Sequence, residues 1–106
     1  MSMEIIWTKT ARNDLNEIVE YIANDSVEIA LKKYFEIRES TKQLNKFPEQ
    51  GRIIPELKNE NLIRFREIII SPWHLMYKIE NKKFYIMAVI DGRRNIEGIL
   101  MKRMLR

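Results

Sequence analysis

The sequence is short of the residues on which several classes of protein depend. Its 106 residues contain no cysteine, one histidine, three glycines and three prolines. Without cysteine there is no disulfide framework, no thiol nucleophile and no thiolate metal site. A single imidazole, His74, excludes a zinc site built from several histidines. No apolar run reaches the roughly 20 residues that a membrane-spanning helix needs. We therefore expect a protein without metal or cofactor and without a membrane partner.

Length and composition are those of one folded domain. A chain of 106 residues is too short for two independent cores. Its 45% of hydrophobic and 32% of charged residues are typical of a globular protein and too apolar for a disordered one. Residues 1–6 lack the pattern of a signal peptide. We expect a single domain over residues 1–106, located in the cytoplasm.

Positive charge is concentrated in the second part of the chain. The net charge of the whole chain is +4. Residues 1–63 carry 9 basic and 11 acidic side chains, whereas residues 64–106 carry 10 basic and 4 acidic side chains. A concentrated positive field favours a polyanion or an acidic protein as a partner. Ordinary solubilising charge is the alternative.

The first half of the chain has the pattern of one strand and two helices. Residues 3–8 alternate and are rich in Ile and Trp, which predicts a strand. Apolar residues then recur every three or four positions over residues 10–23, with Thr8 or Thr10 as the cap. A second row predicts a helix over residues 26–46, opened by a capping box from Asp25 to Glu28 and ended by Pro48. The short turn between the two predicts an antiparallel helical hairpin.

The second half has the pattern of a small sheet. Residues 48–62 show no period and predict a loop. Residues 63–70, 74–80 and 84–90 predict three strands joined by short turns, and hence an antiparallel meander. Residues 96–104 have helical spacing and predict a short helix or an ordered tail. The expected fold is α+β with the order β-α-α-β-β-β(-α), in which the hairpin covers one face of the sheet and the other face is free.

Basic side chains are expected to gather on that free face. A hairpin turning at residues 71–73 would pair residue 70 with about 74 and residue 66 with about 78. The next hairpin would place His74 opposite Ile90. An imidazole among guanidiniums could bind phosphate and transfer a proton, although solvated charge is the alternative for each residue. The residues brought together in this way are Arg64, Arg66, His74, Lys78, Arg93 and Arg94.

Acidic and aromatic residues near these strands have less specific interpretations. Glu67 and Asp91 could act as a base or as salt-bridge partners, and we favour salt bridges. Trp73 lies in a turn and is expected either as a stacking platform or as a half-buried corner. Four further aromatic residues are expected in the core, namely Trp7, Tyr34, Phe47 and Tyr77.

An ordered set of short motifs resembles the RelE/ParE superfamily, the toxin halves of type II toxin–antitoxin systems. The set begins with Trp7-Thr8-Lys9-Thr10-Ala11 and includes Phe47-Pro48, Gly51-Arg52 and Pro55-Glu56. Its longest parts are Arg66-Glu67-Ile68-Ile69-Ile70 and Trp73-His74-Leu75-Met76-Tyr77-Lys78-Ile79. Gly92-Arg93-Arg94 closes the set. The resemblance covers nearly the whole chain and implies the same β-α-α-β-β-β plan.

The resemblance implies one of two activities. RelE-like members are ribosome-dependent, metal-independent mRNA endoribonucleases, and in that case Arg66, His74 and Arg94 would be the catalytic residues. Arg64, Lys78 and Arg93 would then bind phosphate or the target. ParE-like members instead inhibit DNA gyrase.

We favour the ParE-like branch. Residues 95–106 contain no Tyr, His or Asp to donate a proton, and Leu100 lies roughly where the resemblance to RelE-like members implies a Tyr. Both branches imply an antitoxin, whose acidic amphipathic segment would suit the basic second part of the chain.

Overall fold

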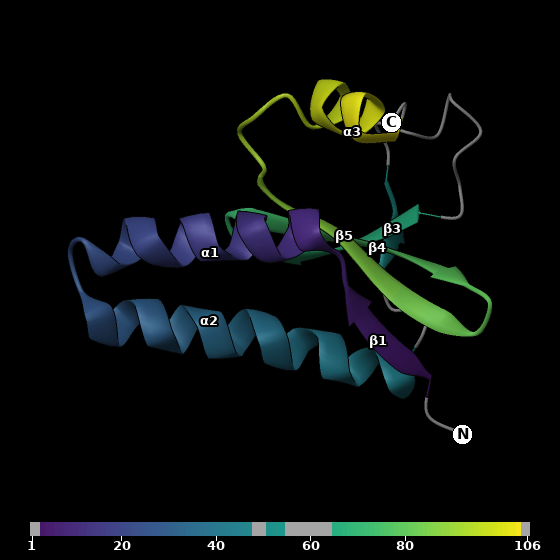
Figure 1. The fold of residues 1–106 in the computed structure, drawn as a ribbon, viewed down its shortest axis with the longest axis horizontal. Helices are drawn as coiled ribbons and strands as arrows, with labels where there is room; N and C mark the ends of the chain where they lie inside the picture. The colour runs from purple at the N-terminus through teal and green to yellow at the C-terminus, as the bar shows by residue number, and fades with distance from the viewer. Residues whose placement is uncertain (1–2, 48–50, 55–64, 105–106) are drawn as a thin grey trace.

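The computed structural model describes residues 3–47, 51–54 and 65–104 (Figure 1). Strand β1 (Glu4–Trp7) leads into α1 (Lys9–Ala23) and α2 (Val27–Lys42), and α2 continues into a 3-10 turn, η1 (Gln43–Asn45). The strands β2 (Arg52–Ile53), β3 (Phe65–Ile70), β4 (Trp73–Glu80) and β5 (Lys83–Asp91) follow, and α3 (Ile96–Met104) is the last described element. The predicted α+β order is confirmed. None of the described helices is long and apolar enough to cross a membrane.

Both long helices begin at a hydroxyl cap. The Thr8 side chain accepts a hydrogen bond from the Ala11 N–H (3.2 Å), as predicted. Helix α2 is capped by Ser26, whose hydroxyl accepts from the Ile29 N–H (3.2 Å), and the prediction of Asp25 as the cap is wrong. Each cap satisfies an amide that has no partner inside the helix. The helices therefore start within one residue of their predicted positions.

The sheet has five strands in the order β1-β5-β4-β3-β2. Strands β3, β4 and β5 form the predicted antiparallel meander. Strand β1 pairs with β5 in parallel, because the α1–α2 hairpin carries the chain across the sheet between β1 and the later strands. Strand β2 lies within the segment predicted as a loop and pairs antiparallel with β3. The rest of that loop, residues 48–50 and 55–62, lies outside the described residues.

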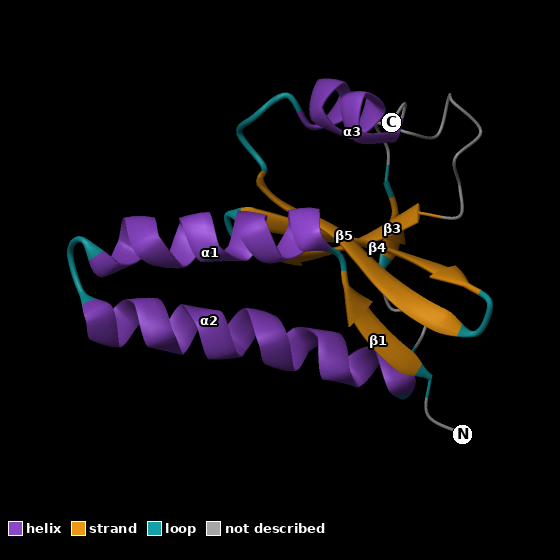
Figure 2. Ribbon diagram, viewed as in Figure 1, coloured by secondary structure: helices purple, strands orange, loops and turns teal. Residues whose placement is uncertain are grey.

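The helical hairpin packs against one face of this sheet (Figure 2). Buried side chains of α1 and α2, such as Leu15 and Ile37, meet Leu75 and Tyr77 of β4 in one core. Trp7 and Tyr34 are partly buried against this core and Tyr77 is fully buried, as predicted. The prediction for Phe47 is wrong, since it is 60% exposed.

The opposite face of the sheet is covered too, which contradicts the prediction of a free face. Ile96 and Leu100 of α3 form a second core with Met76 of β4 and Ile90 of β5. Figure 2 shows the sheet lying between α3 and the α1–α2 hairpin. The apolar residues of α3 are therefore buried on the face of the sheet that was expected to be exposed and functional.

Candidate functional site

The register between β3 and β4 separates Arg66 from His74. Ile70 pairs with Trp73, Ile69 with His74 and Arg66 with Tyr77. Two residues, Ser71 and Pro72, form the turn, and the pairing differs by one residue from the prediction. Side chains alternate between the faces of a sheet, so a shift of one residue reverses the face. Arg66 consequently lies on the hairpin face and His74 on the α3 face, and the prediction that they share a face is wrong.

The predicted pairing of His74 across the second hairpin is correct. His74 pairs with Ile90 in the hairpin of β4 and β5, as expected. Lys78 lies on the same face as His74, where its ammonium group contacts Glu80 (2.6 Å) and the ring of Tyr85 (5.5 Å to the centroid). Arg64 lies outside the described residues.

Arg66 holds the segment that leads into β2. Its guanidinium donates to the Gly51 carbonyl (2.8 Å), and the Gly51 N–H donates to the Tyr77 hydroxyl (3.1 Å). A Cβ atom at Gly51 would lie 2.7 Å from this hydroxyl and from the Glu67 carbonyl, so only glycine fits this close approach. Arg66 thus has a structural partner in this conformation.

Glu67 takes the place beside His74 that was predicted for a cation. Its side chain is completely buried. One carboxylate oxygen accepts from the Arg52 guanidinium (2.7 and 2.8 Å), and the other lies 2.9 Å from His74 Nδ1. The favoured interpretation of Glu67 as a salt-bridge partner is confirmed. Arg52 was not predicted as its partner, because that contact depends on a two-residue edge strand within a predicted loop.

His74 is enclosed on its other side by Gly92. A Cβ atom at residue 92 would lie 2.5 Å from His74 Nε2 and 2.9 Å from Cδ2. The Gly92 N–H also donates to the Pro72 carbonyl (2.8 Å), which fixes the backbone over the ring. With Nδ1 on Glu67 and Gly92 over Nε2, the imidazole is held on both sides.

Asp91 and the two arginines that follow it form a separate group. The Arg93 guanidinium makes two hydrogen bonds to the Asp91 carboxylate (2.6 and 3.0 Å). Hydrogen bonds from the Arg93 side chain and backbone, helped by the charge of Arg94, lower the pKa of Asp91 to about 2. The same contact raises the pKa of Arg93. The salt bridge favoured for Asp91 is confirmed, and Arg94 is exposed without an ion pair to any described residue.

These arginines border a hollow of about 390 Å³ between α1 and the connection from β5 to α3. Helix α1 lines it with Asp14, Glu17, Ile18 and Tyr21, whose spacing of three and four residues places them on one face of the helix. Trp73 and Arg94 line the opposite side. No binding role was predicted for this row of α1, although its helical spacing is visible in the sequence.

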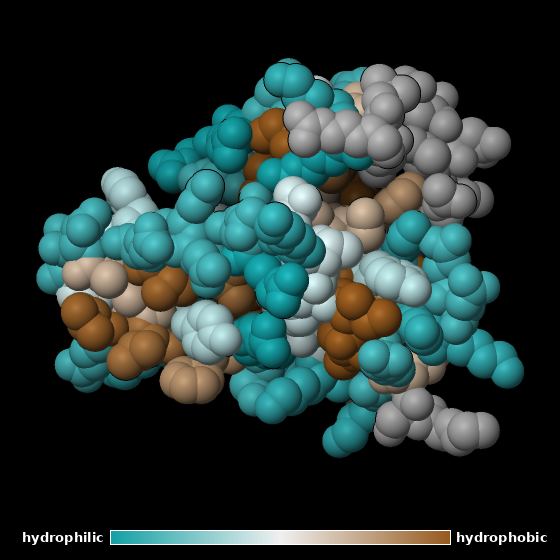
Figure 3. All heavy atoms as spheres, viewed as in Figure 1, coloured by the Kyte–Doolittle hydropathy of each residue, from teal (hydrophilic) through white to brown (hydrophobic). Residues whose placement is uncertain are grey.

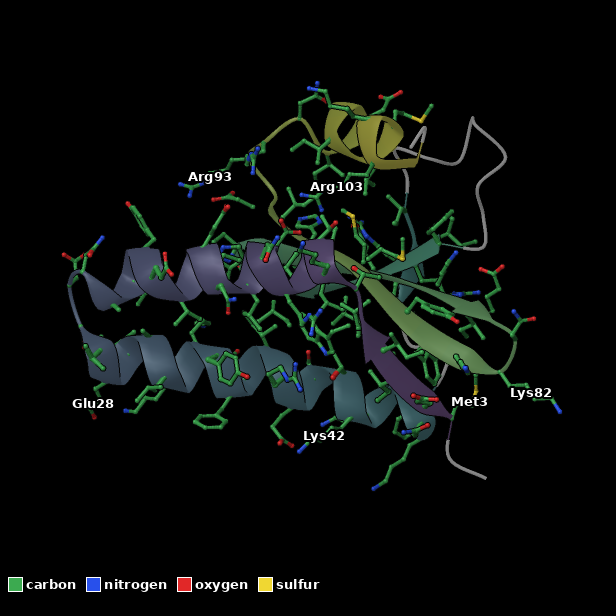
Figure 4. All side chains as sticks on the ribbon, in the orientation of Figure 1. Met3, Glu28, Lys42, Lys82, Arg93 and Arg103 are labelled. Carbon is green, nitrogen blue, oxygen red and sulfur yellow. The ribbon has the colours of Figure 1, made fainter. Side chains whose placement is uncertain are left out.

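Asp14 closes one end of the hollow and fixes α3. Its carboxylate accepts two hydrogen bonds from Arg103 (2.8 and 2.9 Å) and one from the Val89 N–H (3.0 Å). Figure 4 shows Arg103 reaching from α3 towards α1. Pairing between β1 and β5 ends at Ile86, so the Val89 N–H of β5 lies beyond the end of β1. The Asp14 carboxylate supplies the acceptor for this N–H. No group of three acidic or histidine side chains suited to a metal ion occurs in residues 3–47, 51–54 and 65–104.

Comparison with known proteins decides the family. Residues 5–96 match the model of the ParE toxin of the type II toxin–antitoxin system parDE. The chain belongs to the ParE toxin family. It is also 25% identical over 100 residues to Toxin ParE3 of Caulobacter vibrioides, a match that covers 93% of this chain and 96% of that protein. The resemblance to the RelE/ParE superfamily and the preference for its ParE-like branch are confirmed.

A solved structure supports the family fold. The chain is similar to a chain of the chromosomal ParDE system from P. aeruginosa, with a TM-score of 0.70 and 24% sequence identity. The match covers 85% of this chain and 96% of that chain. At this identity the likeness concerns the fold, which is the mixed sheet with helices described above.

Proposed function

We propose that this ParE-type toxin arrests growth by inhibiting DNA gyrase. Membership of the ParE family supports this proposal, and the position of Glu67 beside His74 carries it against the alternative of mRNA cleavage. Cleavage of RNA without a metal requires cations around the reacting phosphate and a group free to move a proton.

The face of the sheet around His74 does not have these properties. Next to His74, β3 presents Phe65, Glu67 and Ile69, of which none is a cation. The cations near this face, Arg52 and Lys78, are already paired with Glu67 and Glu80. The buried carboxylate of Glu67 would repel a phosphate, and it already holds His74 Nδ1. Arg66 lies on the other face of the sheet, bonded to Gly51. Catalytic roles for Arg66, His74 and Arg94 therefore belong only to the less favoured alternative.

Parallel assays of gyrase and RNA test this proposal. Purified toxin is added to gyrase and relaxed plasmid, and supercoiling and gyrase-cleaved DNA are measured. We expect supercoiling to fall and cleaved DNA to accumulate at toxin concentrations near that of gyrase, while cellular mRNA stays intact after induction. Unchanged supercoiling together with mRNA cut at the ribosome would contradict the proposal and establish the alternative.

We also propose that an acidic antitoxin neutralises the toxin by laying a helix along α2. Val27, Leu31 and Phe35 follow each other at a spacing of four residues and are 63%, 50% and 60% exposed. Figure 3 shows hydrophobic residues at the surface of the hairpin. An exposed apolar row of this kind is typical of a surface that receives an amphipathic helix, and the net charge of +4 favours an acidic partner.

Substitutions in this apolar row test the neutralisation. Leu31→Glu and Phe35→Glu should weaken antitoxin binding about tenfold or more, because each removes an apolar contact and adds a charge that repels an acidic segment. Titration calorimetry measures the affinity. Asn16→Glu, which adds the same charge at an exposed position of α1 outside the row, is the matched control and should bind normally. Equal affinity for all the variants would contradict this assignment.

A further inference from the structure

The hollow between α1 and the connection from β5 to α3 lies over the edge of the hairpin core, from which Ile18, Trp73 and Val89 line it. Its α1 side carries Tyr21, whose side chain is 77% exposed, and its other side carries the half-buried Trp73. An aromatic residue as exposed as Tyr21 contributes little to folding stability and is typical of a contact surface. The hollow is therefore a candidate binding pocket, which we call the Arg94 pocket.

The charges of the Arg94 pocket are mostly satisfied within the protein. Asp14 is paired with Arg103, and Asp91 is paired with Arg93. Figure 4 shows Arg93 on the connection that leaves β5. Of the charged residues that line the pocket, only Glu17 and Arg94 lack an ion pair to a described residue. Arg94 is thus the cation available to a ligand.

The walls of the pocket are held in place before any partner binds. The bidentate pair of Asp14 and Arg103 ties α1 to α3, and the Gly92 N–H ties the connection to the Pro72 carbonyl. The ammonium group of Lys33 lies 5.5 Å from the centre of the Trp73 ring and connects α2 to this side. A preformed pocket loses little conformational entropy when a protruding side chain of a folded partner enters it.

We propose that the Arg94 pocket receives an anchor of gyrase, namely an apolar or aromatic side chain next to a carboxylate. The side chain would lie between Tyr21 and Trp73, and the carboxylate would form a charge-assisted pair with Arg94. This inference rests on the proposed inhibition of gyrase. The open apolar row of α2 suits a segment that folds on binding, whereas the compact Arg94 pocket suits a folded target. The two partners thus use different surfaces of the toxin.

Two substitutions in the full-length toxin test this proposal. Arg94→Glu reverses the available charge, and Tyr21→Ala removes the exposed ring. We expect each variant to require at least about tenfold more toxin for half-maximal inhibition of supercoiling, with a matching loss of gyrase binding. Antitoxin affinity should stay within about twofold of the wild-type value. Circular dichroism and a thermal melt confirm that each variant is folded.

Matched controls and separate readouts distinguish the possible failures. Lys82→Glu is an equivalent charge reversal in the turn after β4, and Ile29→Ala truncates an exposed side chain on α2, so both should inhibit gyrase like the wild type. Wild-type toxin without effect on gyrase would refute the proposed function itself. Wild-type inhibition that is unchanged in Arg94→Glu and Tyr21→Ala would refute only the pocket. Loss of antitoxin binding with inhibition retained would assign the pocket to the antitoxin and overturn the proposal.

Discussion

The buried carboxylate of Glu67 ties the edge strand β2 to the centre of the sheet. Removing it in Glu67→Ala would leave His74 and Arg52 without their acceptor and open a cavity beside them. Breaking a buried pair costs about 3–5 kcal/mol, but Arg52 is half-exposed to water, so we expect a loss of about 2–3 kcal/mol in the free energy of unfolding. Urea denaturation measures it. Glu39→Ala, which breaks an exposed pair with Lys42, should change stability by less than about 0.5 kcal/mol.

Gly92 is required by its contact with His74. In Gly92→Ala the new methyl group would meet Nε2 at 2.5 Å, and the ring is held by Glu67 on its other side. We expect a loss of about 1–3 kcal/mol in the free energy of unfolding, the usual range for overpacking. Chemical denaturation of the single variant and of Gly92→Ala combined with His74→Ala tests the cause. If the loss persists in full without the imidazole, a clash with His74 is not its origin.

The ionisation of Asp91 reports its contact with Arg93. The pKa of Asp91 is lowered from 3.8 to about 2 by the hydrogen bonds from Arg93. A carboxylate with a lowered pKa in the folded state contributes stability above its unfolded pKa and loses that contribution as the pH falls through the folded value. An NMR titration of the Asp91 carboxyl carbon should therefore have its midpoint near 2. In Arg93→Ala the midpoint should return towards 3.8, and an unchanged midpoint would show that Arg93 is not the cause.

Helix α3 depends on a side-chain contact that reaches across 89 residues of the chain. Arg103→Lys keeps the positive charge but loses the two parallel hydrogen bonds to Asp14. We expect the local stability of α3 to fall by about 1 kcal/mol or more, so that the amides of α3 exchange several-fold faster with deuterium while those of β4 are unaffected. Equal rates of amide exchange in α3 of the wild type and of Arg103→Lys would show that apolar packing alone holds the helix.

The helices and the meander could be predicted because their signals are local. Apolar spacing located α1 and α2 to within a few residues, and the Thr8 cap of α1 was also visible. The pairing of His74 with Ile90 depends on the turn at Asn81 and Lys82 together with a register shift between Met76 and Tyr77. The register of β3 could not be predicted equally well. One residue more or less in the turn at Ser71 and Pro72 changes the face of Arg66, and the sequence pattern there fits either length.

Long-range contacts explain the rest of the difference between prediction and structure. The row Ile96 to Leu100 has helical spacing, but nothing local indicates that it covers the second face of the sheet. Glu67 beside His74, Asp14 beside Arg103 and the Arg94 pocket all join segments that are distant in the chain. The grouping of the candidate residues into one basic cluster was therefore wrong, while their functional roles stay predictions.

The charge of the whole molecule should act on the rate at which partners meet. The net charge is +4, and residues 64–106 alone carry a net charge of +6. A positive field attracts an acidic antitoxin over a distance that salt shortens from about 14 Å at about 0.05 M to about 4 Å at about 0.5 M. We expect the association rate constant, measured by stopped flow, to fall about tenfold over this range while the dissociation rate changes little. The double variant Lys82→Glu with Lys102→Glu, in which the net charge of +4 becomes zero, should associate more slowly at low salt and depend less on salt. A wild-type association rate that does not respond to salt would mean that short-range apolar contacts alone guide the antitoxin to this surface.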